Sequence, residues 1–288
     1  MTVLAPAPPT AVPTAVAAST RRRVRIAAVA SALGVVVLAF VAFLTVVGGV
    51  DYHRTQNQLF AQLRTELGAA TAPVAAPIAI GRPVAIVRIP KLHLRAVVVQ
   101  GSSARELQRG PGHQVDTPLP GQPGTAVILG RRVAFGAPFA DLVRLHPGDA
   151  VDVITGQGSF RFVVDATWRS DQTHRVATGS GPHLDLLTSD PAFTPSRTFV
   201  VSAHMTAPAV AAGAVATPQS HATALVGDPD AAITAYLWAQ ALLLLAYVVV
   251  RYRRHVPPAV VWLGATPLGL VLLWNVFDNL AALLPNTL

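Results

Sequence analysis

Residues 183–201 read HLDLLTSDPAFTPSRTFVV, and the pattern of this stretch sets the fold class. Two short apolar runs flank a loop with two prolines, which is typical of two strands joined by a turn-rich connection. Ser189 ends the first strand and Arg197 opens the second. Five similar runs lie upstream, bounded by Gly and Pro: VAIVRI, RAVVV, TAVIL, DAVDVIT and SFRFVVDATW. Seven short strands at this spacing predict an all-β sandwich or barrel over residues 84–205.

The run SFRFVVDATW also predicts which side chains are buried. Phe160, Phe162, Val164 and Ala166 occupy every second position. A period of two places these side chains on one face of a strand, and we expect that face to lie in the core.

The composition indicates that part of the chain lies in lipid. Hydrophobic residues make up 52% of the chain and charged residues only 12%, whereas soluble domains carry about 25% charged residues. Residues 26–50, 231–250 and 256–277 form three uncharged runs, each near the roughly 20 residues that a spanning helix needs. Proline interrupts only the third run, at residues 257, 258 and 267.

A cleaved signal peptide is the alternative for residues 26–50, because basic residues precede them. This run is longer than the core of a typical signal peptide, and no clear small-residue cleavage site precedes the polar sequence DYHRTQNQ. The sequence therefore favours an uncleaved anchor.

The net charge of +8 is a topology signal. Residues 51–230 carry 15 basic and 13 acidic residues, so this segment offers no basic patch for nucleic acid. The excess lies in two arginine clusters, within residues 21–25 and 251–254. The positive-inside rule places residues 1–25 and 251–255 in the cytoplasm. Residues 51–230 and the tail from Asp278 are then outside the plasma membrane.

Four connecting segments complete the expected domain plan. Residues 1–25 form a disordered cytoplasmic tail, because residues 1–20 are rich in Ala, Pro and Thr without periodicity. Residues 51–83 form a juxtamembrane helix and a linker; Leu59, Leu63 and Leu67 repeat every four residues, which predicts a helical stalk. Residues 206–230 form a second linker, and residues 278–288 a short external tail.

Most catalytic motifs are missing from the chain. It has no cysteine, and its nine histidines show no metal-ligand spacing. Ser189 lies in LLTSDP, outside any G-x-S-x-G or S-x-x-K motif, and no glycine-rich phosphate loop is present. We therefore expect neither a metal nor a cofactor, and a fold held by its hydrophobic core.

Residues 86–205 nevertheless resemble one family, the sortases, in the form typical of high-GC Gram-positive bacteria. The resemblance rests on linked pieces in a fixed order: IPK, GPGH, TPLPGQPGTAVILG, APFADLVRLHPGD, a strand ending in Thr-Ser and an arginine opening the last strand. It implies a closed eight-stranded β-barrel outside the membrane. It also implies a membrane-anchored cysteine transpeptidase that cuts sorting signals of LPXTG type after threonine.

The resemblance places three catalytic positions in this sequence. Ser189 stands at the position of the family's cysteine, Arg131 at that of its histidine, and Arg197 matches its arginine. A serine hydroxyl is a weak nucleophile without a base, and a guanidinium stays protonated, so Arg131 cannot supply that base. We therefore expect a catalytically silent envelope protein that binds a peptide or an envelope partner.

The alternative is an active serine-dependent transpeptidase or hydrolase acting on cell-wall sorting signals. It requires His113, His174, His183 or His204 to fold within hydrogen-bond reach of Ser189.

Two kinds of partner follow from the sequence. Arg131, Arg132 and Arg197 would attract an acidic peptide or a cell-wall ligand to the barrel groove, unless Arg132 pairs with an acidic side chain. The small residues Gly264, Ala265 and Gly269 would allow a lateral membrane-protein partner to pack closely.

Overall fold

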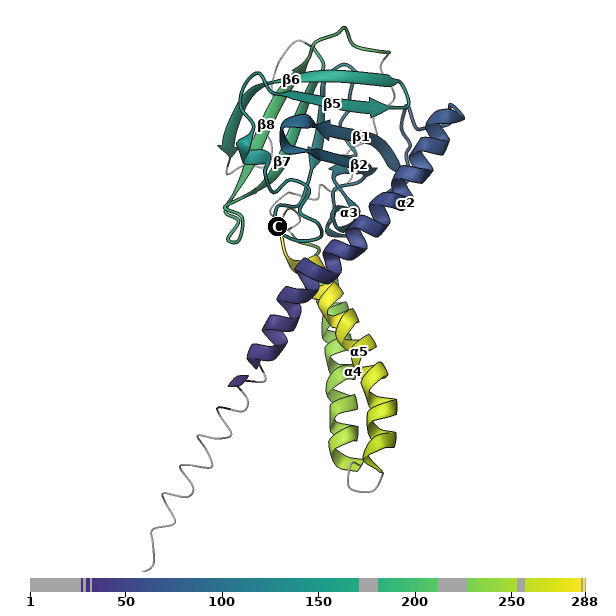
Figure 1. Cartoon of the computed structure of the whole chain (residues 1–288), viewed down its shortest axis with the longest axis vertical. Coiled ribbons are helices and arrows are strands. Elements are labelled where there is room, and N and C mark those ends of the chain that lie inside the picture. The colour runs from purple at the N-terminus through teal and green to yellow at the C-terminus, as the bar shows by residue number, and fades with distance from the viewer. Residues whose placement is uncertain are drawn as a thin grey trace, which may run out of the picture. The chain divides into compact units, whose positions relative to one another are not determined.

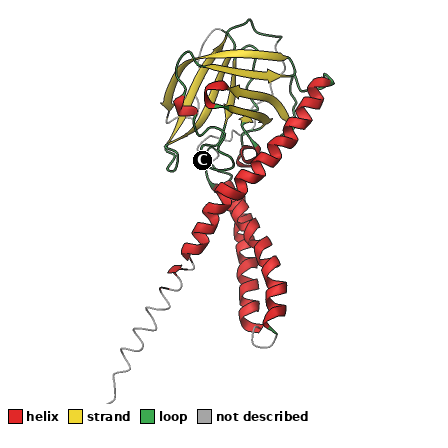
Figure 2. Ribbon diagram, viewed as in Figure 1, coloured by secondary structure: helices red, strands yellow, loops and turns green. Residues whose placement is uncertain are grey.

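The computed structural model describes residues 27, 30, 31, 33–170, 181–211, 227–252, 257–285 and 287. Its contacts divide the chain into Met1–Ala42 and Phe43–Leu288. All strands belong to the second unit, as do helices α2 to α5 (Figures 1 and 2).

The strands form a closed barrel in the order β1-β2-β3-β4-β7-β8-β6-β5. This confirms the predicted all-β, eight-stranded barrel. The strands are β1 (Pro83–Ile89), β2 (Leu94–Gln100), β3 (Gly112–His113), β4 (Thr125–Leu129), β5 (Ala150–Thr155), β6 (Gly158–Ser170), β7 (His183–Asp190) and β8 (Arg197–Met205). Short helical turns lie between them: η2 (Pro90–Leu92), α3 (Ala104–Arg109) and η3 (Leu142–Arg144).

The barrel interior is a single apolar core to which most of the strands contribute. Ile128, Phe162 and Leu186 are completely buried there, on three different strands. Phe160 and Val164 are buried as predicted, but Ala166 is exposed, so its predicted burial is wrong. The pairing of β6 with β8 shifts register between Val164 and Ala166. Such a bulge adds one residue and reverses the alternation beyond it.

Strand β3 has no counterpart in the hydrophobic pattern, because it is only two residues long. It pairs parallel to β2 and antiparallel to β4, so it connects two strands that would otherwise leave a gap in the barrel. Beyond it, β4 and β7 pair in parallel, and Leu129 at the end of β4 lies opposite Leu187.

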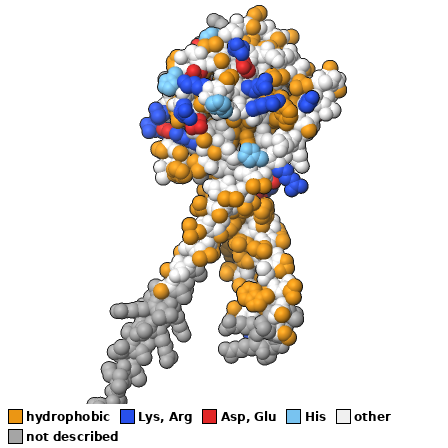
Figure 3. Space-filling view, in the orientation of Figure 1, with side chains coloured by type: hydrophobic (Ala, Val, Ile, Leu, Met, Phe, Trp, Pro, Cys, Tyr) orange, Lys and Arg blue, Asp and Glu red, His pale blue; other side chains and the backbone are white. Residues whose placement is uncertain are grey.

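Three helices are long and apolar enough to cross a membrane: Leu33–Gly68, Ala231–Tyr252 and Val261–Leu283. The last two belong to α4 (Ala231–Tyr252) and α5 (Pro258–Leu283), and Pro267 lies inside α5. Large apolar side chains on both helices are exposed, as lipid-facing residues would be. In Figure 3, hydrophobic side chains cover these helices, whereas charged side chains gather on the barrel.

Helix α2 (Gly48–Gly68) follows a π-helical turn, η1 (Phe43–Val47), and packs directly on the barrel. Leu59 and Leu63 are buried against Ile86, Val97 and Val99 of β1 and β2. The helix is therefore a docked element as well as a connection to the membrane.

Gln56 of α2 forms hydrogen bonds with backbone groups at one place on the barrel where β2 and β3 do not pair. Its side-chain amide accepts a hydrogen bond from Val97 N at 2.7 Å and donates to Val97 O at 3.1 Å and to Arg109 O at 2.9 Å. Because β3 pairs only with Val99 and Gln100, the backbone of Val97 depends on this side chain.

Substitution Gln56→Ala should destabilise the protein by about 1–3 kcal/mol, because it leaves backbone groups unpaired at a partly buried site. Thermal unfolding of the full chain in detergent would measure the change. Gln58→Ala is the matched control, since Gln58 is an exposed residue of the same type on the same helix. Equal midpoints for the two variants would contradict this role of Gln56.

Candidate functional site

The three predicted catalytic positions come together at one end of β4, β7 and β8. Arg131 lies two residues beyond Leu129, and Ser189 two residues beyond Leu187, which is the partner of Leu129. In the neighbouring pair, Asp190 lies opposite Arg197. The parallel pairing of β4 with β7 thus places positions 131 and 189 side by side in the backbone.

Hydrogen bonds extend this pairing past the end of the ladder. The backbone N–H of Gly130 donates to Leu187 O at 3.0 Å, and the Thr188 hydroxyl donates to Gly130 O at 2.9 Å. Leu187 packs on Leu107 of α3, outside the barrel interior. Since side chains alternate along a strand, Ser189 shares that outer face.

Arg131 is completely buried and has few partners. Its Nη2 donates to Ala104 O at 3.1 Å, and its guanidinium carbon lies 4.9 Å from the centre of the Phe135 ring. Its Nε and Nη1 atoms have no hydrogen-bond partner within the described part of the chain. Burial lowers the pKa of Arg131 to about 9, so the side chain remains charged at neutral pH. Arg131 therefore links the start of α3 to the end of β4.

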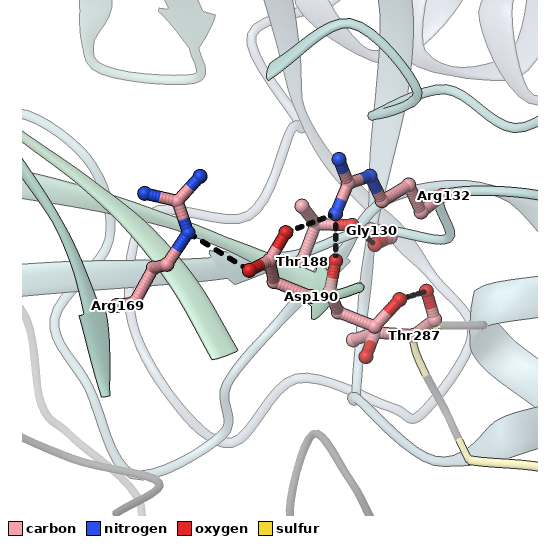
Figure 4. Close-up of polar contacts among 7 residues, drawn as sticks. Gly130, Arg132, Arg169, Thr188, Asp190 and Thr287 are labelled. Carbon is pink, nitrogen blue, oxygen red and sulfur yellow. Dashed lines mark hydrogen bonds and ion pairs between the residues drawn. The ribbon is translucent and has the colours of Figure 1, made fainter. Parts of the chain in front are cut away.

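Arg132 forms an ion-pair network with Asp190 and Arg169 (Figure 4). Its Nη1 lies 2.7 Å from Asp190 Oδ1 and also donates to Ser189 O at 2.7 Å. Arg169 Nε donates to Asp190 Oδ2 at 2.8 Å. Burial raises the pKa of Asp190, but the hydrogen bonds and charges of both arginines outweigh it, and the net pKa lies below its ordinary value. Arg132 thus pairs with an acidic side chain.

Ser189 is also completely buried, and its hydroxyl already has a partner. It donates to the backbone carbonyl of Thr287 at 2.9 Å. The same carbonyl accepts a hydrogen bond from the backbone N–H of Arg132 at 2.9 Å. Ser189 thus points at a peptide carbonyl that has a second, backbone donor.

None of the candidate histidines in the described regions is hydrogen-bonded to Ser189. His113 bonds to Gln100 and to Pro118 O, both at 3.0 Å, and burial lowers its pKa to about 4, which keeps it neutral. His183 contacts Gly181 O, and His204 contacts Asp165. His174 lies outside the described residues.

Arg197 differs from the other two predicted positions, because it is exposed at the start of β8. With Arg131 buried and Arg132 paired with Asp190, it is the one member of the predicted arginine trio that faces solvent.

Residues 87–206 match the family model described as a sortase domain. The barrel is a sortase domain. Sortase D of Bacillus subtilis (strain 168) is 29% identical over 87 residues, which cover 30% of this chain and 42% of that protein. The chain therefore matches about two fifths of the length of this curated relative.

Solved sortase structures are also similar to this chain. A sortase D5 transpeptidase from Clostridium perfringens aligns with 16% identity and a TM-score of 0.47, covering 54% of this chain and 99% of that one. Sortase E from Streptomyces avermitilis aligns with 27% identity and a TM-score of 0.41, covering 45% and 91% of the two chains.

Three residues of this sortase-domain site were not among the predicted site residues: Arg169, Asp190 and Thr287. Asp190 directly follows Ser189, so its proximity to the site could have been predicted from the sequence. The local sequence does not show which arginines it binds. Arg169 binds Asp190 and Thr287 binds Ser189, and both partners lie 20 or more residues away in the sequence, so only the tertiary fold brings them together.

The burial of Arg131 gives a prediction about stability. Arg131→Met should raise the free energy of unfolding by about 1–2 kcal/mol, because it removes a buried charge and two unpaired donor groups. The adjacent Arg132→Met is the matched control and should lower it by about 1–3 kcal/mol, because it leaves Asp190 with one arginine. Thermal unfolding of both variants tests the contrast. A loss of stability in Arg131→Met would show that its bond to Ala104 outweighs the cost of burial.

Asp190 should make the stability of the fold depend on pH. A carboxyl with a lowered pKa stabilises the fold above its unfolded value of 3.8, and loses this contribution as the pH falls through its folded pKa. Asp190→Asn should therefore melt at a lower temperature than the parent at pH 7, and the gap should narrow below pH 4. Melting curves across this range would measure it, and a constant gap would contradict the prediction.

Proposed function

We propose that this protein is a catalytically silent sortase-family protein of the bacterial cell envelope that binds a peptide or an envelope partner. The observation that carries the proposal is the state of Arg131 and Ser189. Arg131 is buried and charged at the position where a sortase needs a histidine. The Ser189 hydroxyl donates to a carbonyl, and no described imidazole removes its proton. A serine without a base is a poor nucleophile.

The same surface has features that suit a peptide ligand. Ser189 Oγ and the backbone N–H of Arg132 both point at one carbonyl oxygen, and Arg197 lies exposed one strand away. Two fixed donors that converge on a carbonyl suit the backbone of an extended peptide. The exposed guanidinium adds a group that attracts carboxylates.

The alternative is a serine-dependent transpeptidase or hydrolase that acts on sorting signals. The two donors around one carbonyl favour it, because this arrangement is also how an oxyanion is stabilised. What it lacks is a general base near Ser189 among the described side chains.

We place the barrel outside the plasma membrane and the N-terminus in the cytoplasm, with the two arginine clusters inside. The bond between Ser189 and Thr287 supports the number of crossings, because it requires both residues to lie on the same side of the membrane. Three crossings put the segment between the first two spans and the segment after the third on the same side, where they can touch.

Lateral association with another membrane protein is a further part of the proposal. Gly264 faces open space on α5, whereas Gly269 already lies against Leu245 of α4.

Peptide cleavage and transfer assays on the purified full chain test the proposal. LPXTG-type peptides are the substrates, and mass spectrometry detects the products. A truncation after Leu283 is assayed in parallel, because Thr287 engages the Ser189 hydroxyl. We expect no turnover that depends on Ser189 in either form.

Two variants control the assay. Ser189→Ala sets the background, and the pair Arg131→His with Ser189→Cys restores the family's residues. Activity only in the restored protein would show that the groove is intact and the chemistry alone is missing. Turnover by the parent that Ser189→Ala abolishes would overturn the proposal in favour of the serine enzyme.

A further inference from the structure

The segment that follows α5 returns to the barrel and lies on the candidate site. Helix α5 ends at Leu283, and Leu284 then adopts an extended conformation with φ −66° and ψ 155°. Thr287 is completely buried, although threonine is a polar residue. Burial of such a residue calls for specific partners.

Those partners are the functional positions themselves. The Thr287 carbonyl accepts hydrogen bonds from Ser189 Oγ and from the backbone N–H of Arg132, each at 2.9 Å. Ser189 stands at the nucleophile position of the domain, and Arg132 follows the histidine position. The segment therefore presents a peptide carbonyl to the place where a substrate carbonyl would lie.

The end of α5 is fixed close to this site. Ala282 and Leu283 pack with Ala104 of α3 and Ala231 of α4. The backbone N–H of Asp228 also donates to Ala282 O at 2.8 Å. Thr287 lies four positions after Leu283, a reach of about 13 Å when extended. The segment is thus held beside Ser189 by a short connection.

We propose that the segment carrying Thr287 is an internal ligand of the Ser189 site, bound through the Thr287 carbonyl, and that it competes with any external peptide for this site. This inference rests on the proposed peptide-binding function and names the occupant of the site. The sequence of residues 284–288, LPNTL, also suits this role. It matches the LPXTG pattern implied by the sortase resemblance at Leu, Pro and Thr, and lacks its glycine.

The short connection makes this competition strong. A flexible linker of a few residues holds its ligand at a local concentration of about 1 mM or more. An external peptide should therefore bind the full chain at least about tenfold more weakly than a chain without the segment.

The absence of cysteine from the chain allows a direct test. In a Ser189→Cys variant, alkylation of the thiol by iodoacetamide reports access to the site, with adducts counted by intact mass. Truncation after Leu283 should raise the alkylation rate about tenfold or more, because two hydrogen bonds that hold the cover are lost. An unchanged rate would overturn the inference.

Two control thiols separate uncovering from unfolding. Ser159→Cys lies at an exposed position of β6, and its rate should be the same with and without the segment. Ser202→Cys lies at a buried position of β8 and should stay protected in both forms. A rise at residue 202 equal to that at residue 189 would also overturn the inference, because the segment would then hold the fold together rather than cover one site.

A peptide arm distinguishes this inference from the proposed function. The blocked peptide ALPNTL is added to the truncated Ser189→Cys protein, with a scrambled peptide as control. Renewed protection by ALPNTL alone would support both proposals. If truncation raises the alkylation rate but ALPNTL does not lower it again, the internal ligand is supported and binding of an external peptide is contradicted. If labelled ALPNTL binds the full chain and truncation changes neither its affinity nor the alkylation rate, external binding is supported and the internal ligand is contradicted.

Discussion

The parallel pairing of β4 with β7 is the constraint on which the rest of the site depends. Because Leu129 and Leu187 are partners, the residues that follow each of them must lie together. The Thr188 hydroxyl extends the pairing to Gly130. Arg131 and Ser189 are then neighbours whatever their chemistry. The barrel fixes where a catalytic pair would stand and leaves the identity of its members open, which is how one fold can carry both active and altered sites.

The side chains at the two predicted positions have different structural roles. Ser189 places a small hydrogen-bond donor at the end of β7. The guanidinium of Arg131 is directed to Ala104 and Phe135, where it takes part in packing. A buried cation with unpaired donors is costly. The stabilising network lies one residue later, where Arg132 and the more exposed Arg169 both pair with the buried carboxylate of Asp190.

Local pattern was sufficient for most of the fold but not for the site. The seven apolar runs correspond to strands because alternation and turn residues are local signals, and the three uncharged runs correspond to the apolar helices. The two-residue strand β3 carries no such signal, and the bulge in β6 cannot be read from alternation. The sequence placed Ser189, Arg131 and Arg197 only through the family resemblance. The burial of Arg131, the pairing of Asp190 and the return of Thr287 arise from contacts between distant segments.

The docking of α2 on the barrel has a consequence for how the barrel can turn. A domain joined by a loose linker samples many orientations, whereas this one is held on α2 by Gln56 and two leucines. The packing of α3 against the end of α5 holds it at a second place. Because the two contacts lie on different helices, the barrel cannot rotate about either of them alone. A ligand that reaches Ser189 therefore meets it in a fixed orientation relative to both helices.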